Sequence, residues 1–291
     1  MVMVALLFPA APATADNARD WQNLPINTPV AFAYYYHMDS NTSLDTALPV
    51  RNASTEINAG LLRFAYAFDA GNGKSSGVQV LQTFADVDFS LGGTPFDKSR
   101  KGLGDTTVIL ATNLFGGPAY TVDEFVKAKP ETFLTAALWV TAPTGRYDPK
   151  KVINLGANRW AFKPQLAFGH PFGKSWIEAN AWLQFFTDND DYLNGRTLKQ
   201  DPRLGLEAHY SYNVTPWFWV SADVFYTHGG KTTINSVTEN DGGDTWKGGI
   251  GAQLMLSPED AISFAYIDTI ARPAGDADVK TFMLSYRRLF F

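Results

Sequence analysis

Long stretches of this chain alternate between apolar and polar side chains, and this alternation constrains the fold more than any other feature of the sequence. In residues 203–214 every second side chain is apolar, from Leu204 to Val214, and the side chains between them are polar or glycine. Successive side chains of a β-strand point to opposite faces, so the pattern predicts a strand with one apolar face. Twelve stretches are candidate strands of this kind, near 28–38, 56–69, 76–90, 104–115, 131–143, 158–170, 174–187, 202–215, 216–227, 246–257, 260–271 and 278–290.

The length of these stretches separates two kinds of all-β protein. A soluble two-sheet sandwich also alternates, but its strands are usually about 5–6 residues long, whereas most of these run from 11 to 15 residues. In a membrane every backbone group needs a hydrogen-bond partner, so spanning strands must close into a barrel. Such a barrel presents every second side chain to lipid and the others to its lumen. The stretches therefore favour a transmembrane barrel.

The connections between the stretches alternate between short and long. The links at 215–216 and 257–259 are tight turns that contain proline, whereas 39–55 and 228–245 are long. Segment 116–130 is a long exception on the short side, and we expect a helical turn within it. Short periplasmic turns and long extracellular loops are typical of outer-membrane barrels. The sequence thus predicts a single antiparallel up-and-down β-barrel of about twelve strands, with both termini on the periplasmic side.

The composition agrees with this class and argues against others. Charged residues make up 18% of the chain, below the roughly 25% of a typical soluble domain. The net charge of -5 gives no reason to expect a nucleic-acid partner. The chain has no cysteine, which excludes a thiol nucleophile, a disulfide framework and a cysteine-based metal site. We expect no cofactor, and one barrel domain.

Both ends of the chain carry possible sorting signals. Residues 2–15 form an apolar run that ends in Ala13-Thr14-Ala15, an A-x-A cleavage pattern. Because a basic region is missing before it, we predict a truncated signal peptide over 1–15 and a barrel over 16–291; a buried N-terminal strand is the alternative.

The other end of the sequence is Leu289-Phe290-Phe291. Outer-membrane barrels generally finish on a strand with a terminal aromatic residue that the assembly machinery reads, although an apolar tail docked in a core would look similar. The expected location is the bacterial outer membrane. The expected partners there are membrane lipid, lipopolysaccharide and the assembly machinery, together with a small-molecule cargo.

Several short motifs lie in the middle of the chain and near the predicted rim of the barrel. They are GLGD (102–105), APTGRYD (142–148), NLGANRWAFKP (154–164), FFTDND (185–190) and QDP (200–202). With these motifs the chain resembles the outer-membrane transporter family of meta-pathway phenol-degradation proteins. The resemblance implies a barrel that passes small, often aromatic or apolar, molecules across the outer membrane. It brings no catalytic residues with it.

Charged side chains within the strands indicate what the lumen contains. A charge is costly against lipid, so such residues are assigned to the lumen. The predicted lumen and constriction set is Arg63, Asp86, Lys163, Glu178, Gln184, Glu207, His209, Asp223 and Lys247. Counted from the loop ends, Lys163, Glu207 and Asp223 lie at similar depth, which suggests a constriction of mixed charge. The alternative is a salt-bridge ladder that packs the lumen shut.

Five aromatic residues are also predicted to face inward: Trp139, Trp182, Phe186, Trp219 and Phe225. Their rings would either stack a small aromatic guest or simply fill volume.

Charged loop residues are expected to shape the extracellular mouth. The acidic run 188–191 faces the loop 144–157, which is rich in basic residues, so we expect charge and hydrogen-bond pairs between the two; a solvated loop is the alternative. The predicted mouth residues are Arg146, Tyr147, Asp148, Arg159, Asp188, Asp190 and Asp201. The acidic run offers oxygen ligands for Ca²⁺ but lacks the spacing of an EF-hand loop. We predict no metal site.

An enzymatic reading rests on His209 and Ser211, an H-x-S arrangement that resembles lipid A deacylases, with Glu207 two residues earlier. A nucleophile needs a base within hydrogen-bond reach, and residues two apart on a strand are separated by about 6–7 Å. The predicted phase also points this trio into the lumen rather than toward lipid. The sequence therefore favours a non-enzymatic barrel.

The favoured function is passive or facilitated diffusion of small, aromatic or hydrophobic molecules across the outer membrane. In this hypothesis Arg63 and Lys163 attract a carboxylate or phenolate, while Glu207 and Asp223 limit anion flux. Two alternatives remain: a structural or adhesive barrel with a plugged lumen, and a lipid hydrolase that depends on His209.

Overall fold

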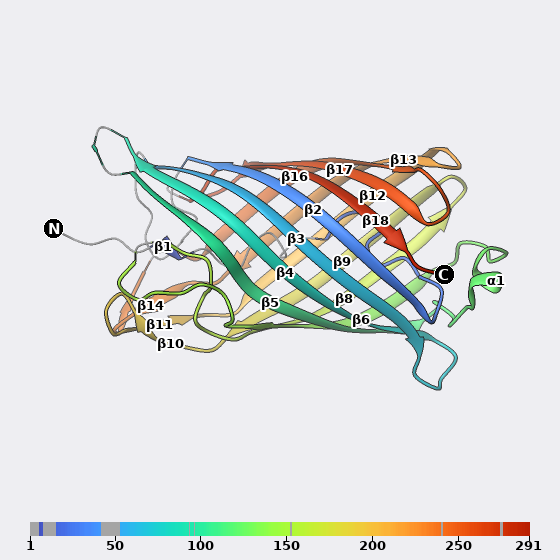
Figure 1. The fold of residues 1–291 in the computed structure, drawn as a ribbon, viewed down its shortest axis with the longest axis horizontal. Coiled ribbons are helices and arrows are strands. Elements are labelled where there is room, and N and C mark those ends of the chain that lie inside the picture. Colours follow the sequence, from blue (N-terminus) through green and yellow to red (C-terminus); the bar gives the residue numbers. More distant parts are fainter. Residues whose placement is uncertain are drawn as a thin grey trace.

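Twelve antiparallel strands close into one barrel (Figure 1). The computed structural model describes residues 6–7, 16–41, 53–92, 94–95, 97–151, 153–239, 241–273 and 276–291. The barrel strands are β2 (Thr28–Ser40), β3 (Ala53–Asp69), β4 (Ser75–Leu91), β5 (Asp97–Phe115), β6 (Phe133–Ala142), β8 (Ala161–Phe172), β9 (Ser175–Phe186), β12 (Arg203–Thr215), β13 (Phe218–Gly229), β16 (Gly243–Met255), β17 (Asp260–Ala271) and β18 (Val279–Leu289). Neighbours in sequence pair along the wall, and β18 pairs with β2 to complete the circle. The predicted fold class and strand number are confirmed.

Several strands extend beyond the predicted bounds on the side of the long loops. β5 begins at Asp97 rather than near residue 104, and β3 begins at Ala53 rather than near residue 56. A spanning strand needs about 9–11 residues, whereas β5 has 19. The upper parts of these strands therefore project past the membrane, where both faces of the wall meet water.

This projection corrects one prediction. Asp86 was assigned to the lumen, but it pairs in register with Asn58 on the outer face of the barrel, the same face as the exposed Phe84. Its carboxylate lies 2.5 Å from the ammonium group of Lys101. The rule that a charge must avoid the outer face applies only at the depth of the lipid, and Asp86 lies above it.

Small elements lie at the two ends of the barrel (Figure 1). At the extracellular end β10 (Asn189–Tyr192), β11 (Arg196–Gln200), β14 (Thr232–Ile234) and β15 (Val237–Thr238) form a four-stranded sheet, which the sequence pattern did not predict. Nearby, β1 (Leu6–Leu7) pairs with β7 (Ile153–Asn154). At the opposite end, close to the C-terminus, α1 (Val122–Phe125) is the helical turn expected within 116–130.

The outer face of the barrel is an apolar belt. Leu62, Leu110, Ile177 and Ile250 are among its exposed side chains. Because Pro164 on β8 has no N–H to donate, the pairing of β8 with β9 is interrupted at this position. The paired residues pass from Phe162–Phe185 directly to Gln165–Trp182. No helix in the described part of the chain is long and apolar enough to cross a membrane.

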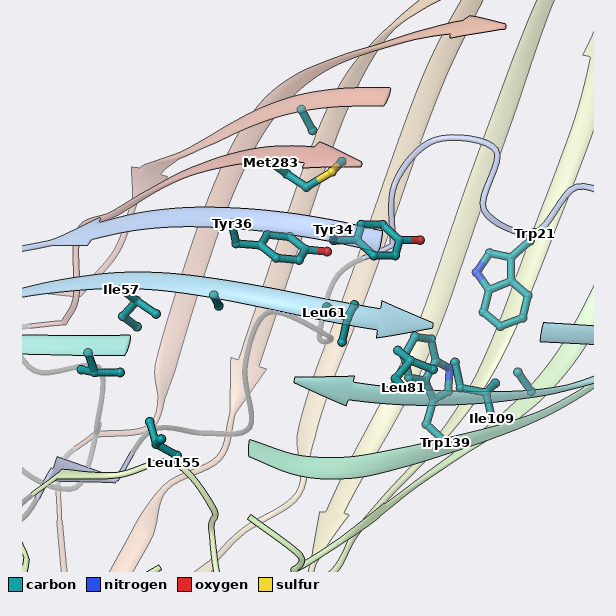
Figure 2. Close-up of a cluster of buried hydrophobic side chains, with 14 of the residues drawn as sticks. Trp21, Tyr34, Tyr36, Ile57, Leu61, Leu81, Ile109, Trp139, Leu155 and Met283 are labelled. Atoms are coloured by element: carbon teal, nitrogen blue, oxygen red, sulfur yellow. The ribbon is translucent and has the colours of Figure 1, made fainter. Parts of the chain in front are cut away.

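The buried core of this barrel lies inside the lumen. Residues 16–27 precede β2 and fold back into the barrel; we call this segment the N-terminal plug. Figure 2 shows Trp21 of the plug projecting into the interior space that Tyr34 and Tyr36 of β2 also enter. Trp21 packs edge-on against Trp139 of β6, with ring centroids 6.3 Å apart. The lumen is thus a packed interior with an N-terminal occupant rather than an open tube.

Candidate functional site: the lumen and its plug

The N-terminal plug is anchored at the periplasmic rim and reaches to the middle of the barrel. Near the rim, the backbone N–H of Asn27 donates to Ala67 O at 2.7 Å, and that of Ile26 donates to Tyr120 O at 2.8 Å. At its inner end, the side chain of Asp16 accepts hydrogen bonds from Gln165 and Asn180 on the barrel wall. Nothing in the sequence of 16–27 has a period that would have predicted this docking.

Asp16 lies at the centre of a buried polar cluster. Its carboxylate also accepts a hydrogen bond of 2.7 Å from the indole N–H of Trp21, and its backbone N–H donates to Glu207 Oε2 at 3.2 Å. Burial, assisted by the nearby charge of Glu207, raises the pKa of the Asp16 carboxyl to about 6. The inner end of the plug is therefore held by specific polar contacts but carries an unfavourable like-charge neighbour.

Lys163 is the cation of this cluster. Its ammonium nitrogen lies 3.8 Å from the ring centroid of Trp139 and 5.2 Å from that of Trp182, a cation–π arrangement. Among the described residues it has no hydrogen-bond partner. Glu207 accepts a 2.8 Å hydrogen bond from the indole of Trp182. Two of the predicted lumen charges, Lys163 and Glu207, thus lie beside two of the predicted aromatic residues, Trp139 and Trp182, around the tip of the plug.

Arg19 of the plug contacts β9, β12 and β13 on the periplasmic side of this cluster. Its guanidinium donates to Ser211 Oγ at 2.8 Å and to Asn213 Oδ1 at 2.7 Å, and lies 4.7 Å from the ring centroid of Trp219. Its backbone N–H donates to Glu178 Oε2 at 2.8 Å. The plug therefore closes, with its own side chains, part of the path that the sequence assigned to a constriction.

His209 is held between two carboxylates. Its Nδ1 lies 2.7 Å from Asp223 Oδ1, and its Nε2 lies 3.8 Å from Glu207 Oε2. Ser211 instead accepts a hydrogen bond from Arg19. Because both imidazole nitrogens face carboxylates, the His–Ser contact that a hydrolase needs is not formed here. The edge of the His209 ring packs on Phe225, at 5.5 Å between centroids.

Arg63 lies nearer the periplasmic end. Its guanidinium donates to Gln79 at 2.6 Å and to the Tyr34 hydroxyl at 3.3 Å, lies 4.9 Å from the ring centroid of Phe32, and lies 3.7 Å from Asp20 of the plug. The inward phase of Phe32 and Tyr34 was missed because β2 carries aromatic residues on both faces, Tyr35 being exposed to the outside. An alternating pattern cannot assign such a strand.

The remaining lumen residues lie above the central cluster. Gln184 and Phe186 continue the inner face of β9, and Lys247 pairs in register with Phe225. The Arg159 guanidinium lies 4.5 Å from the ring centroid of Phe186 and donates to Gln200. This upper region connects the lumen to the mouth.

The mouth is organised around Asp105, the last residue of the GLGD motif, for which the sequence pattern predicted no role. Its two carboxylate oxygens accept 2.8 Å hydrogen bonds from the backbone N–H groups of Gly145 and Ala157. A Cβ on Gly145 would lie 2.7 Å from the Cα of Gly156, so only glycine permits this approach. The GLGD, APTGRYD and NLGANRWAFKP motifs thus meet around one carboxylate. We call this set of contacts between the three loop segments the Asp105 knot.

The acidic residues of the mouth pair within their own hairpin. Asp188 lies 2.9 Å from Lys199, and Asp190 accepts a hydrogen bond from Thr197. Contacts between the two loops run instead through the Tyr147 hydroxyl, which donates to Asp191 O at 2.9 Å and accepts from Asn189 at 3.1 Å.

Three other predicted mouth residues form backbone contacts. Asp148 N donates to Asn154, Arg146 donates to Lys101 O, and Asp201 N donates to Lys231 O. Within the described ranges no three His, Cys, Asp or Glu side chains are grouped so as to hold a metal ion.

A closed twelve-stranded barrel with an apolar outer belt and a polar, partly filled lumen defines the class of transmembrane barrels of the bacterial outer membrane. The chain belongs to the family described as "Putative MetA-pathway of phenol degradation", whose model matches residues 39–271. The resemblance drawn from the motifs is therefore confirmed.

Solved structures share the fold. The COG4313 outer membrane channel from Pseudomonas putida F1 superposes with a TM-score of 0.82 at 21% identity, covering 95% of this chain and 100% of that chain. The transport unit of the autotransporter AIDA-I from Escherichia coli gives a TM-score of 0.59 at 9% identity, covering 97% and 95% respectively. The β domain of the Bordetella autotransporter BrkA gives 0.58 at 12%, covering 91% and 100%. No curated relative matches significantly.

Proposed function

We propose that this chain is an outer-membrane channel for passive or facilitated diffusion of small aromatic or hydrophobic molecules, and that the N-terminal plug sets how far the lumen is open. The observation that carries the proposal is a cavity of about 520 Å³ inside the barrel, next to the plug. Its lining residues include Phe32 and Tyr34, whose side chains point into the lumen. Ligand sites for small molecules commonly have volumes of about 300–1,000 Å³ and mostly apolar walls, so a single aromatic ring fits this space. The membership of the family supports the choice of cargo.

A second candidate is a structural barrel with a closed lumen, and the plug itself is the observation that favours it. The side chains of Asp16, Arg19 and Trp21 occupy the centre of the barrel. The two candidates differ in whether the plug can leave.

Single-channel recording in planar bilayers distinguishes them. Protein purified from outer membranes is compared with the Trp21→Ala variant, which lacks the main apolar contact of the plug. A channel gives discrete current steps that Trp21→Ala enlarges, and phenol reduces the current with rising concentration. Silence from both folded proteins would overturn the channel and leave the structural barrel.

We further propose that β18 is read by the outer-membrane assembly machinery and that the apolar belt contacts lipid and lipopolysaccharide. Phe282, Leu284 and Tyr286 alternate outward along β18, and Phe290 follows in the same phase. Phe290→Ala is expected to lower the amount of folded barrel in the outer membrane, measured by heat-modifiable mobility on gels, and an unchanged amount would contradict this role.

A further inference from the structure

The cavity beside the N-terminal plug has an unusual wall on the side of β2. Phe32, Tyr34 and Tyr36 point inward one after another, and their rings stack at centroid distances of 5.9 Å each. Figure 2 shows Tyr34 and Tyr36 side by side on β2. Such a ladder offers a continuous aromatic surface running from the periplasmic half of the lumen toward its centre.

Two arginines flank the first ring of this ladder. Phe32 pairs in register with Arg63 on β3 and with Arg287 on β18. With strands about 4.7–4.9 Å apart, the two Cα atoms lie about 10 Å from each other on either side of the ring. Both side chains line the cavity. Arg287 Nε is buried and has no hydrogen-bond partner among the described residues.

Asp20 is the plug carboxylate closest to this pair. Its Oδ2 lies 3.7 Å from Arg63 and accepts a hydrogen bond of 3.2 Å from the backbone N–H of Asn17 within the plug. Asp20 lines the cavity together with Arg63 and Arg287. Asp223 also lines the cavity, but it is engaged by His209 and Ser221. The wall therefore has two cations and an aromatic face, and the N-terminal plug supplies one carboxylate, Asp20.

We propose that this cavity is a binding site for small aromatic carboxylates. The ring of the ligand lies against the Phe32–Tyr34 ladder, and its carboxylate lies between Arg63 and Arg287, where Asp20 of the docked plug acts as an internal stand-in. Arginine forms strong, directional hydrogen bonds with carboxylates, whereas a neutral aromatic molecule gains only the stacking. The ligand and the plug therefore compete. This proposal rests on the channel function and narrows its cargo.

Binding is measured on the purified, detergent-solubilised barrel, so that the result does not depend on conductance. Trp21 and Trp219 line the cavity and report binding by their fluorescence. Benzoate is compared with benzyl alcohol, which has a similar size and no charge. We expect benzoate to bind at least tenfold more tightly. Arg287→Gln is expected to abolish that preference, and Asp20→Asn is expected to raise the affinity for benzoate severalfold.

The neighbouring arginine provides a matched control. Arg288 follows Arg287 on β18 but points outward, where it contacts Asp260 at 3.5 Å. Arg288→Gln is expected to leave both affinities unchanged. Equal affinities for the two ligands, or a benzoate preference that survives in Arg287→Gln, would overturn the carboxylate site while leaving the channel in place. The failure of the channel itself is seen separately, as the absence of current from both the natural protein and Trp21→Ala.

A different observation concerns how the plug is held. Asp16 is only 3% exposed, and its backbone nitrogen lies 3.2 Å from the carboxylate of Glu207. The cluster around it contains the carboxyl groups of Asp16, Glu178, Glu207 and Asp223, against which the described residues set Lys163, the plug residue Arg19 and the imidazole of His209. One oxygen of Glu178 has no hydrogen-bond partner in the described part of the chain. Buried carboxylates need cations or hydrogen-bond donors nearby, so this cluster has room for one more positive charge.

The sequence places a cleavage pattern immediately before this residue, at Ala13-Thr14-Ala15. We infer that a signal peptidase hydrolyses the bond between Ala15 and Asp16, and that the new terminus is held by Glu207. Water adds to the peptide bond, leaving a carboxylate on Ala15 and an amine on Asp16. The released segment includes β1 (Leu6–Leu7), so the pairing of β1 with β7 is absent from the mature barrel. An α-amino group has a reference pKa of about 7.7–8.0, so it is protonated at neutral pH. The resulting ammonium supplies the additional positive charge of the cluster, and the mature N-terminus binds to Glu207 inside the lumen.

The mass of the protein isolated from outer membranes tests the first part, with a chain that begins at Asp16 as the expected result. For the second part, one glycine is inserted between Ala15 and Asp16, so that cleavage leaves a terminus displaced by one residue. We expect faster proteolysis of the plug in this protein and in Glu207→Gln, and no further increase when the two changes are combined. A different mature terminus, or a plug as resistant as in the natural protein, would overturn the inference.

Discussion

The two ends of the barrel are held together in different ways. At the mouth, the Asp105 knot joins three loop motifs through backbone hydrogen bonds and a glycine–glycine contact, so the parts fit in only one arrangement. On the periplasmic side, the N-terminal plug is held inside mainly by side chains such as Trp21 and Arg19. Contacts made through the backbone resist change, whereas contacts made through side chains can be released without disturbing the barrel wall. The comparison indicates that the mouth is the permanent part of this barrel and the plug the adjustable part.

The largest effect is expected from a substitution in the Asp105 knot at the mouth. In Gly145→Ala the new methyl group would lie 2.7–2.8 Å from backbone and side-chain atoms of Gly156 and Asp105, and backbone cannot move aside. We expect the free energy of unfolding to fall by about 3 kcal/mol, the upper end of the usual cost of overpacking. The measurement is the temperature of heat-modifiable unfolding, which should be lower. Gly60→Ala is the control because its nearest atom would be 3.9 Å away. An unfolding temperature equal to that of Gly60→Ala would contradict a rigid knot.

The next effect releases the adjustable part. Trp21→Ala removes a buried aromatic contact, a change that costs about 3–5 kcal/mol in protein cores, but here the loss falls on plug docking and leaves the strand ladders intact. We expect a severalfold larger single-channel current with an unchanged unfolding temperature. Trp217→Ala, at a residue that is 55% exposed, controls for the loss of an indole. A current that does not change in Trp21→Ala would show that the plug does not limit the path.

A smaller effect is expected from substitutions of Lys163, where the plug meets the barrel wall. Lys163 is the cation nearest the inner end of the plug, between Trp139 and Trp182. Lys163→Glu is expected to shift the channel toward cations, measured as the reversal potential in a salt gradient, with a shift of about half that size for Lys163→Met. Unchanged selectivity would mean that Lys163 does not line the ion path.

The smallest effect concerns the outer wall above the membrane. In the Asp86–Lys101 pair Lys101 is exposed and Asp86 is partly exposed, and such surface pairs contribute about 0–1 kcal/mol. Lys101→Ala is therefore expected to leave the unfolding temperature almost unchanged. Because the chain has no cysteine, Asp86→Cys can be labelled on intact cells by a membrane-impermeant maleimide, and we expect rapid labelling. Protection from the reagent would return Asp86 to the lumen.

The sequence was sufficient to predict the strands of the barrel wall but not the segment that fills the lumen. Alternation predicts strands such as β12 almost to the residue, because lipid on one side and the lumen on the other impose opposite requirements on neighbouring side chains. The same reasoning failed at Asp86, which lies beyond the lipid, and could not assign β2, whose two faces are both aromatic. The plug has no period at all, and its partners, such as Glu207 for Asp16, lie 191 residues away. Docking of that kind is decided by tertiary contacts.

The attachment of the plug to β2 has a consequence for the molecules that reach the lumen. Asn27 ties the segment to the rim, one residue before β2 begins at Thr28. Because the plug is joined to the barrel by so short a tether, it meets its site at an effective concentration of the order of millimolar. Dilution of the protein does not lower this effective concentration. A solute that needs the same space must therefore outcompete a permanent neighbour. The resting barrel would then discriminate among solutes by binding strength, as well as by the width of its passage.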